Sequence, residues 1–125
     1  MSVEDNLKWG DFVPQGWKSM FDQLVQDLAA LEETPVIVEA KQKFGRLRVY
    51  LDRGSEGAHQ LIDRVSRVSL QTCERCGAPG RLMIQRNGFY ETLCTDHQGT
   101  ARMAGEDPIV ASFRPLGNGT LRQVE

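Results

Sequence analysis

The sequence lacks any apolar run long enough to cross a membrane. Aliphatic stretches such as Val36-Ile37-Val38 are far shorter than the roughly 20 apolar residues that a transmembrane helix needs. The first residues, MSVEDNLKWGDF, also lack the basic start and the apolar run of a secretory signal. These absences predict a protein that is neither exported nor inserted in a membrane.

Cysteine is scarce as well, with three residues in a chain of 125. An odd number argues against a closed set of disulfides, and all three cysteines lie at the spacing of metal ligands. Thiolates persist best in a reducing compartment. We therefore expect the protein to be cytoplasmic.

The chain has little net charge, −2 at pH 7, which gives no support to nucleic-acid binding. The charges are unevenly distributed, however. Residues 1–35 contain two lysines and seven acidic residues, whereas residues 36–104 contain eleven basic and seven acidic residues. The acidic segment before Pro35 is therefore the first candidate surface for a basic partner.

Groups that perform catalysis are few. The sequence has no glycine-rich phosphate-binding motif and no grouping of serine, histidine and acid as a nucleophilic triad. If His97 binds a metal, His59 is the remaining histidine that could act as an acid or base, and no sequence signal places an acid or a nucleophile beside it. The sequence predicts that the protein is not an enzyme.

The most specific pattern present is a set of four metal-ligand residues. Cys73 and Cys76 form one pair and Cys94 and His97 form another, each pair with two intervening residues, and 17 residues separate the pairs. This spacing is typical of a site for one zinc ion. The alternative is three free buried cysteines and an unrelated histidine.

The predicted zinc is structural, because three cysteines and one histidine fill its four tetrahedral positions, whereas a catalytic zinc keeps one position open. Zinc deaminases need a His-x-Glu element, and His59 is followed by Gln60-Leu61. Nucleases built on a treble clef zinc finger need another histidine on their hairpin, and residues 81–93 contain none.

The expected fold class is α+β, with a helix–hairpin–helix core and an appended treble-clef-like zinc module. Residues 1–71 are predicted to form the α-β-β-α core, with helices over 16–33 and 56–68, the second capped by Ser55. The apolar stripe of the first helix is Trp17, Met20, Phe21, Leu24, Leu28 and Leu31. That of the second is Ala58, Leu61, Ile62, Val65 and Val68.

Between these helices, residues 36–40 and 46–51 are predicted to form a hairpin with Gly45 at positive φ. Its outer face combines basic and aromatic residues, which can hold phosphates and stack bases. The alternative is a solvated sheet face in which Glu39 pairs with Arg48. The candidate contacts for a nucleic acid or another partner are Lys41, Lys43, Arg46, Arg48 and Tyr50.

Residues 72–104 are predicted to form the zinc module. Gly77 provides a tight turn after the second cysteine, and Asn87-Gly88 predicts a hairpin. A short helix over 95–103 would complete the treble clef. Residues 105–125 are expected to form a tail, with one short strand over 109–113.

Four segments in this order carry a resemblance: "GWKSMFDQLVQDL", "KQKFGRLRVY", "TCERCGAPG" and "TLCTDH". Over residues 16–98 the chain resembles a family of small, poorly characterised bacterial and phage-encoded zinc-knuckle proteins. The resemblance implies a cytoplasmic accessory protein of a bacterium or its phage.

The predicted function is non-enzymatic binding of another protein, in an immunity or antitoxin-like role against a bacterial effector or toxin, or as a phage accessory protein. The alternative is a nucleic-acid-binding zinc-finger protein that uses the basic strand at residues 41–53. We expect no membrane partner.

Overall fold

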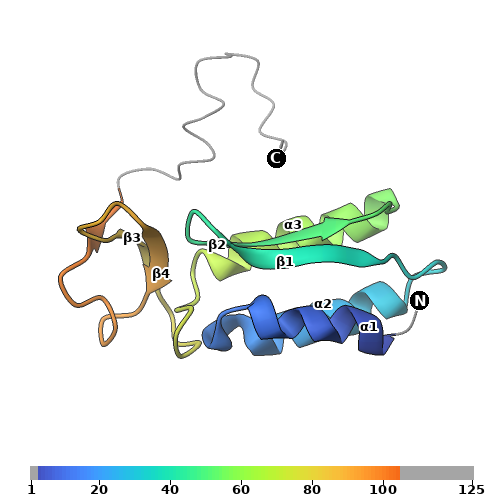
Figure 1. Cartoon of the computed structure of the whole chain (residues 1–125), viewed down its shortest axis with the longest axis horizontal. Helices are drawn as coiled ribbons and strands as arrows, with labels where there is room; N and C mark the ends of the chain where they lie inside the picture. Colours follow the sequence, from blue (N-terminus) through green and yellow to red (C-terminus); the bar gives the residue numbers. More distant parts are fainter. Residues whose placement is uncertain (1–2, 105–125) are drawn as a thin grey trace, which may run out of the picture.

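The computed structural model describes residues 3–104 of the chain. It confirms the predicted α+β class, with three α-helices and two small antiparallel sheets. Figure 1 shows an elongated arrangement, with β3 and β4 at one end and α1 towards the other. None of the helices in residues 3–104 is long and apolar enough to span a membrane. The strand predicted at 109–113 lies outside the described residues.

The chain begins with the short helix α1 (Val3–Leu7) and the 3-10 helices η1 (Lys8–Phe12) and η2 (Gln15–Trp17). Helix α2 (Lys18–Ala29) follows. The predicted helix over 16–33 was therefore too long at both ends. At its C-terminal end the Ala30 N–H donates to the carbonyl oxygens of both Gln26 and Asp27, a shared bond typical of a helix terminus.

Helix α2 contributes the apolar stripe that its sequence predicts. Four of the six stripe residues are fully buried in the main core, and the other two, Met20 and Leu31, pack against it. Of the neighbouring aromatic residues, Trp9 is partly buried, whereas Phe12 is exposed. The fully buried stripe residues are Trp17, Phe21, Leu24 and Leu28.

Strands β1 (Ile37–Lys43) and β2 (Arg46–Leu51) form the two-stranded antiparallel sheet. A bulge between Ile37 and Glu39 shifts the register, so Ile37 and Ala40 both reach the core although they are three residues apart. Val38 is left exposed. Gly45 has a φ of 84°, as its place in the turn predicts.

Helix α3 (Glu56–Ser69) packs against β2 and α2. Ser55 caps it, because its side chain accepts a hydrogen bond from the Ala58 N–H. The prediction that Val68 is buried was wrong, since this side chain is 46% exposed. Ser66 and Ser69 face the interior instead, and Ser69 Oγ accepts a 2.9 Å hydrogen bond from the Leu47 N–H of β2.

The last strands are β3 (Arg81–Ile84), β4 (Tyr90–Leu93) and β5 (Arg102–Met103), in the order β4-β3-β5. The turn between β3 and β4 contains Asn87-Gly88, as predicted, and the Gly88 N–H donates to the Gln85 carbonyl oxygen. A second, smaller core lies beside this sheet. Its buried residues are Cys73, Met83, Leu93 and Cys94.

Candidate metal centre

The first ligand pair lies in a tight loop between α3 and β3. The Gly77 N–H donates to the Cys73 carbonyl oxygen at 2.8 Å, and the Cys73 N–H donates to the Ala78 carbonyl oxygen at 2.7 Å. Gly77 has a φ of 85°, which a residue with a Cβ rarely adopts. The chain therefore closes on itself and turns both sulfurs, of Cys73 and Cys76, toward one point.

The second pair follows directly after β4. The His97 N–H donates to the Cys94 carbonyl oxygen at 3.1 Å, and Gly99 has a φ of 53°. The helix predicted over 95–103 is absent: these residues form turns that lead into β5. A left-handed residue ends a helix rather than continuing it, so Gly99 interrupts the predicted segment. Within residues 3–104 the module therefore lacks the helix that defines a treble clef.

The four predicted ligand atoms converge on one point, all within 4.8 Å of one another. The Sγ atoms of Cys76 and Cys94 are 3.7 Å apart, and Cys73 Sγ lies 3.6 Å from His97 Nδ1. Both separations are too long for covalent bonds, and the cysteines are free. A tetrahedral ion about 2.3 Å from sulfur and about 2.0 Å from nitrogen holds its ligands roughly 3.5–3.8 Å apart. The geometry is thus compatible with one metal ion.

The electrostatics of the thiols also fit a cation. Burial raises the pKa of the Cys73 thiol, but backbone N–H groups led by that of Cys94 outweigh burial and bring the pKa to about 6, below its ordinary 9.0. The Ala78 N–H lowers the pKa of Cys76, yet desolvation and the sulfurs of Cys94 and Cys73 raise it overall. The repulsion between neighbouring sulfurs is what a bound divalent cation relieves.

Gly16 and Trp17 join this module to the main core. The Gly16 N–H donates to the Glu74 carbonyl oxygen at 2.7 Å, and Trp17 Nε1 donates to the Thr72 carbonyl oxygen at 2.8 Å. A Cβ on Gly16 would lie 2.1 Å from the Cys73 carbonyl oxygen, so this close approach requires glycine. The Gly-Trp pair therefore anchors the backbone of the first ligand loop.

Glu74, between the two cysteines of that loop, is a buried carboxylate that the sequence did not single out. Its Oε1 accepts hydrogen bonds from Gln42 Nε2 at 3.0 Å and from the Thr92 N–H at 3.1 Å. Gln42 Nε2 also donates to the Tyr90 carbonyl oxygen at 2.8 Å. Burial raises the pKa of Glu74, and the hydrogen bond from Gln42 opposes that shift. One acid thus links β1, β4 and the ligand loop.

The β1–β2 turn completes the contact between the two parts. Thr92 Oγ1 donates to the Gly45 carbonyl oxygen at 2.7 Å, and the rings of Phe44 and Tyr90 meet edge to face at 6.3 Å. The ligand loop, the Gly-Trp pair and this turn therefore meet at one boundary, which we call the seam. The sequence does not predict these contacts, because the residues that form them lie tens of positions apart in the chain.

The basic strand is solvated at Lys41 and Glu39, as one reading of the sequence predicted, but not at Arg48. Arg48 is only 7% exposed and its guanidinium lies 5.5 Å from the centre of the Tyr50 ring. Glu39 lies opposite Tyr50 rather than Arg48, and its carboxylate is 3.5 Å from Lys41 Nζ. Arg48 therefore contributes to packing, and the proposed pair between Glu39 and Arg48 is replaced by one with Lys41.

Fold and site together define an α+β protein with a Cys3His cluster that is compatible with one metal ion. No family model matches the chain, and comparison with curated proteins and with solved structures finds no match either.

Proposed function

We propose that this chain is a non-enzymatic binding protein stabilised by one zinc ion at Cys73, Cys76, Cys94 and His97. The supporting observation is the convergence of three sulfurs and one imidazole nitrogen, all within 4.8 Å of one another. Soft thiolates together with imidazole favour zinc over calcium or magnesium, which prefer oxygen. Four protein ligands leave the zinc ion no open coordination position for a substrate, so the ion stabilises the fold. The protein then acts by binding its partner rather than by catalysis.

Zinc content tests the first half of this proposal. Purified protein should contain about one zinc per chain by elemental analysis. Cys76→Ser should lower that content, whereas Thr95→Ser, which alters an exposed neighbour of Cys94, should leave it unchanged. Folded, soluble wild-type protein without any bound metal would contradict the assignment.

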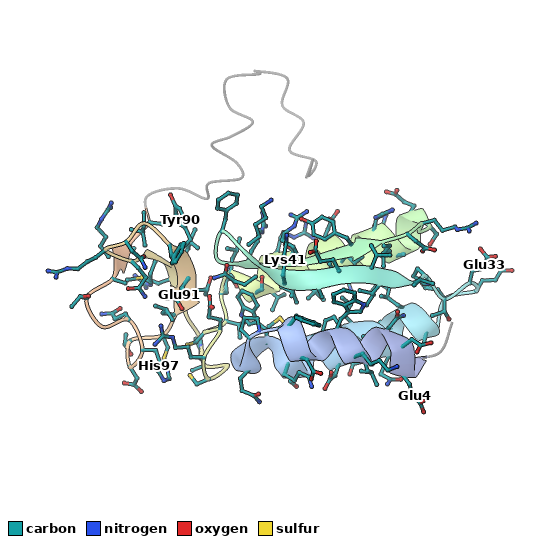
Figure 2. The ribbon with its side chains drawn as sticks, viewed as in Figure 1. Glu4, Glu33, Lys41, Tyr90, Glu91 and His97 are labelled. Carbon is teal, nitrogen blue, oxygen red and sulfur yellow. The ribbon has the colours of Figure 1, made fainter. Side chains whose placement is uncertain are left out.

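The partner that we propose is another protein, in an immunity or antitoxin-like role against a basic bacterial effector or toxin, or as a phage accessory protein. Figure 2 shows Glu4 and Glu33 near the end of the molecule away from His97, which leaves an acidic end distant from the metal centre. Complementary charge accelerates encounter with a basic partner. Glu32 and Glu33 are both exposed at this end.

The effect of the protein should depend on the fraction of its partner that is bound, not on catalytic turnover. In a cell assay the effect should titrate with one molecule of this protein per partner. Glu32→Lys combined with Glu33→Lys should weaken it, whereas His59→Ala, which changes an exposed residue on α3, should retain it. Turnover at substoichiometric protein, lost on changing His59, would instead indicate an enzyme.

A further inference from the structure

An open hollow of about 860 Å³ lies between the tips of the two hairpins, β1–β2 and β3–β4. Its volume falls within the roughly 300–1,000 Å³ range of ligand sites. Figure 2 places Tyr90 and Glu91 in the end of the molecule that contains His97, away from Glu33. The lining residues that matter here are Lys43, Phe44, Arg75, Arg86, Phe89 and Tyr90.

Two aromatic rings in this hollow are presented to solvent. Phe89 is 71% exposed, and Phe44 is 42% exposed. Phe44 has a φ of 55°, a left-handed conformation that turns of this kind usually assign to Asn, Asp or Gly. Tyr90 meets Phe44 edge to face, and Lys43 Nζ lies 5.7 Å from the centre of the Phe44 ring. The hollow therefore offers flat apolar faces in positions set by the two turns.

The charges around these rings are mainly positive. Lys43, Arg75 and Arg86 line the hollow, against one carboxylate, Glu91. That carboxylate already has partners: Arg75 Nη2 lies 3.2 Å from its Oε2, and Gln85 Nε2 donates to its Oε1 at 2.6 Å. The exposed Arg86 therefore gives the hollow a positive charge that can attract an anion.

We propose that this hollow binds single-stranded nucleic acid, a binding site separate from the acidic end and additional to the proposed function. Bases would stack on Phe89 and Phe44, while Arg86 would hold phosphate. Stacking on aromatic side chains tolerates any base, since every base has a π face, and single strands expose those faces. An acidic peptide without aromatic residues would supply the charge but no flat faces for two rings.

Fluorescence anisotropy with labelled oligonucleotides tests the proposal on the zinc-loaded full chain. The probes are oligo-dT and oligo-U of about 12 nucleotides, which separate DNA from RNA, and an oligo-dT·oligo-dA duplex. Phe89→Ala should weaken single-strand binding about tenfold or more, and Phe89→Trp should preserve it. Arg86→Gln should weaken binding and reduce its dependence on salt between about 50 and about 200 mM.

Matched controls lie elsewhere on the surface. Phe12→Ala removes another exposed ring, and Arg64→Gln removes an exposed arginine on α3, so neither should change binding. The proposal is overturned if wild type binds neither single strand, if it binds duplex as tightly, or if the controls lose binding equally. It is also overturned if polyglutamate binds at the hollow and the oligonucleotides do not. Zinc content is measured in parallel, so a negative result for nucleic-acid binding would not contradict the structural zinc assignment.

Discussion

Trp17 Nε1 donates a 2.8 Å hydrogen bond to the carbonyl oxygen of Thr72, which lies 55 residues further along the chain. The indole is fully buried in the main core, and Thr72 immediately precedes the first candidate metal ligand, Cys73. The two parts of the molecule therefore share a partly buried polar contact at the seam. The state of the metal centre and the packing of α2 should be coupled through it.

Replacement of Trp17 by phenylalanine tests this contact. Trp17→Phe keeps an aromatic ring but leaves the Thr72 carbonyl without its indole donor, so we expect a loss of about 1–3 kcal/mol in the free energy of unfolding. Trp9→Phe, at a partly buried position beside Phe12, should have a smaller effect. Urea denaturation followed by circular dichroism measures both. Equal stability of wild type and Trp17→Phe would contradict the coupling.

A methyl group at Gly16 should open the seam. Gly16→Ala would place Cβ 2.1 Å from the Cys73 carbonyl oxygen, and relief of that overlap should cost about 1–3 kcal/mol or more. Zinc affinity should fall with stability, because the displaced backbone holds a ligand.

Gly57→Ala is the matched control for Gly16→Ala. Gly57 is the second residue of α3, and a Cβ there meets its nearest neighbours at ordinary distances of 3.7 and 3.8 Å. Alanine should therefore stabilise the protein by up to about 1 kcal/mol. Thermal melts of both variants should shift in opposite directions, and a shared direction would argue against a seam clash.

The hydroxyl of Ser69 should matter although the residue lies at the end of α3. Ser69→Ala removes the acceptor of the Leu47 N–H, and an unsatisfied buried N–H costs about 1–3 kcal/mol. Ser19→Ala changes an exposed serine on α2 and should alter stability by less than about 0.5 kcal/mol. Hydrogen exchange adds a local measurement: the Leu47 amide should exchange faster in Ser69→Ala. An unchanged rate would mean that the bond does not protect it.

Arg48 should behave as a packing residue. Its side chain is buried against Tyr50, so Arg48→Ala should destabilise the fold by about 1–2 kcal/mol through lost stem packing and ring contact. Arg64→Ala, on the exposed side of α3, should stay within about 0.5 kcal/mol of wild type. Equilibrium unfolding of the two variants tests this prediction. Similar free energies of unfolding for Arg48→Ala and Arg64→Ala would indicate instead that the Arg48 side chain is solvated.

Metal removal should affect more than the ligand loops. A structural zinc can contribute on the order of 10 kcal/mol to its module, so full chelation should unfold residues 72–104. Because Trp17 and Gln42 bond to that module, the main core should also lose stability. Calorimetry with and without a chelator should show a lower thermal midpoint, restored by added zinc. A midpoint unchanged after complete metal removal would contradict the proposed role of the ion.

The sequence by itself predicted features that depend on neighbouring residues. The stripe of α2, the cap at Ser55 and the positive φ of Gly45 follow from periodicity and local backbone preference. The four candidate ligands could be recognised from the sequence for the same reason, because each pair lies within one turn of the chain. The sequence could not predict how close the two pairs lie in space, because that depends on how the β3–β4 hairpin between them folds.

Tertiary structure decided the features that depend on distant partners. The Val68 position is exposed because Ser69 is turned inward toward a backbone N–H of β2, and Arg48 is buried beside Tyr50. The seam places Gly16 against Cys73, and the buried carboxylate of Glu74 meets donors from β1 and β4. Hydrophobic periodicity describes one element at a time. The free energy of a buried hydrogen bond or a backbone contact depends on which elements meet, and the folded chain alone determines that.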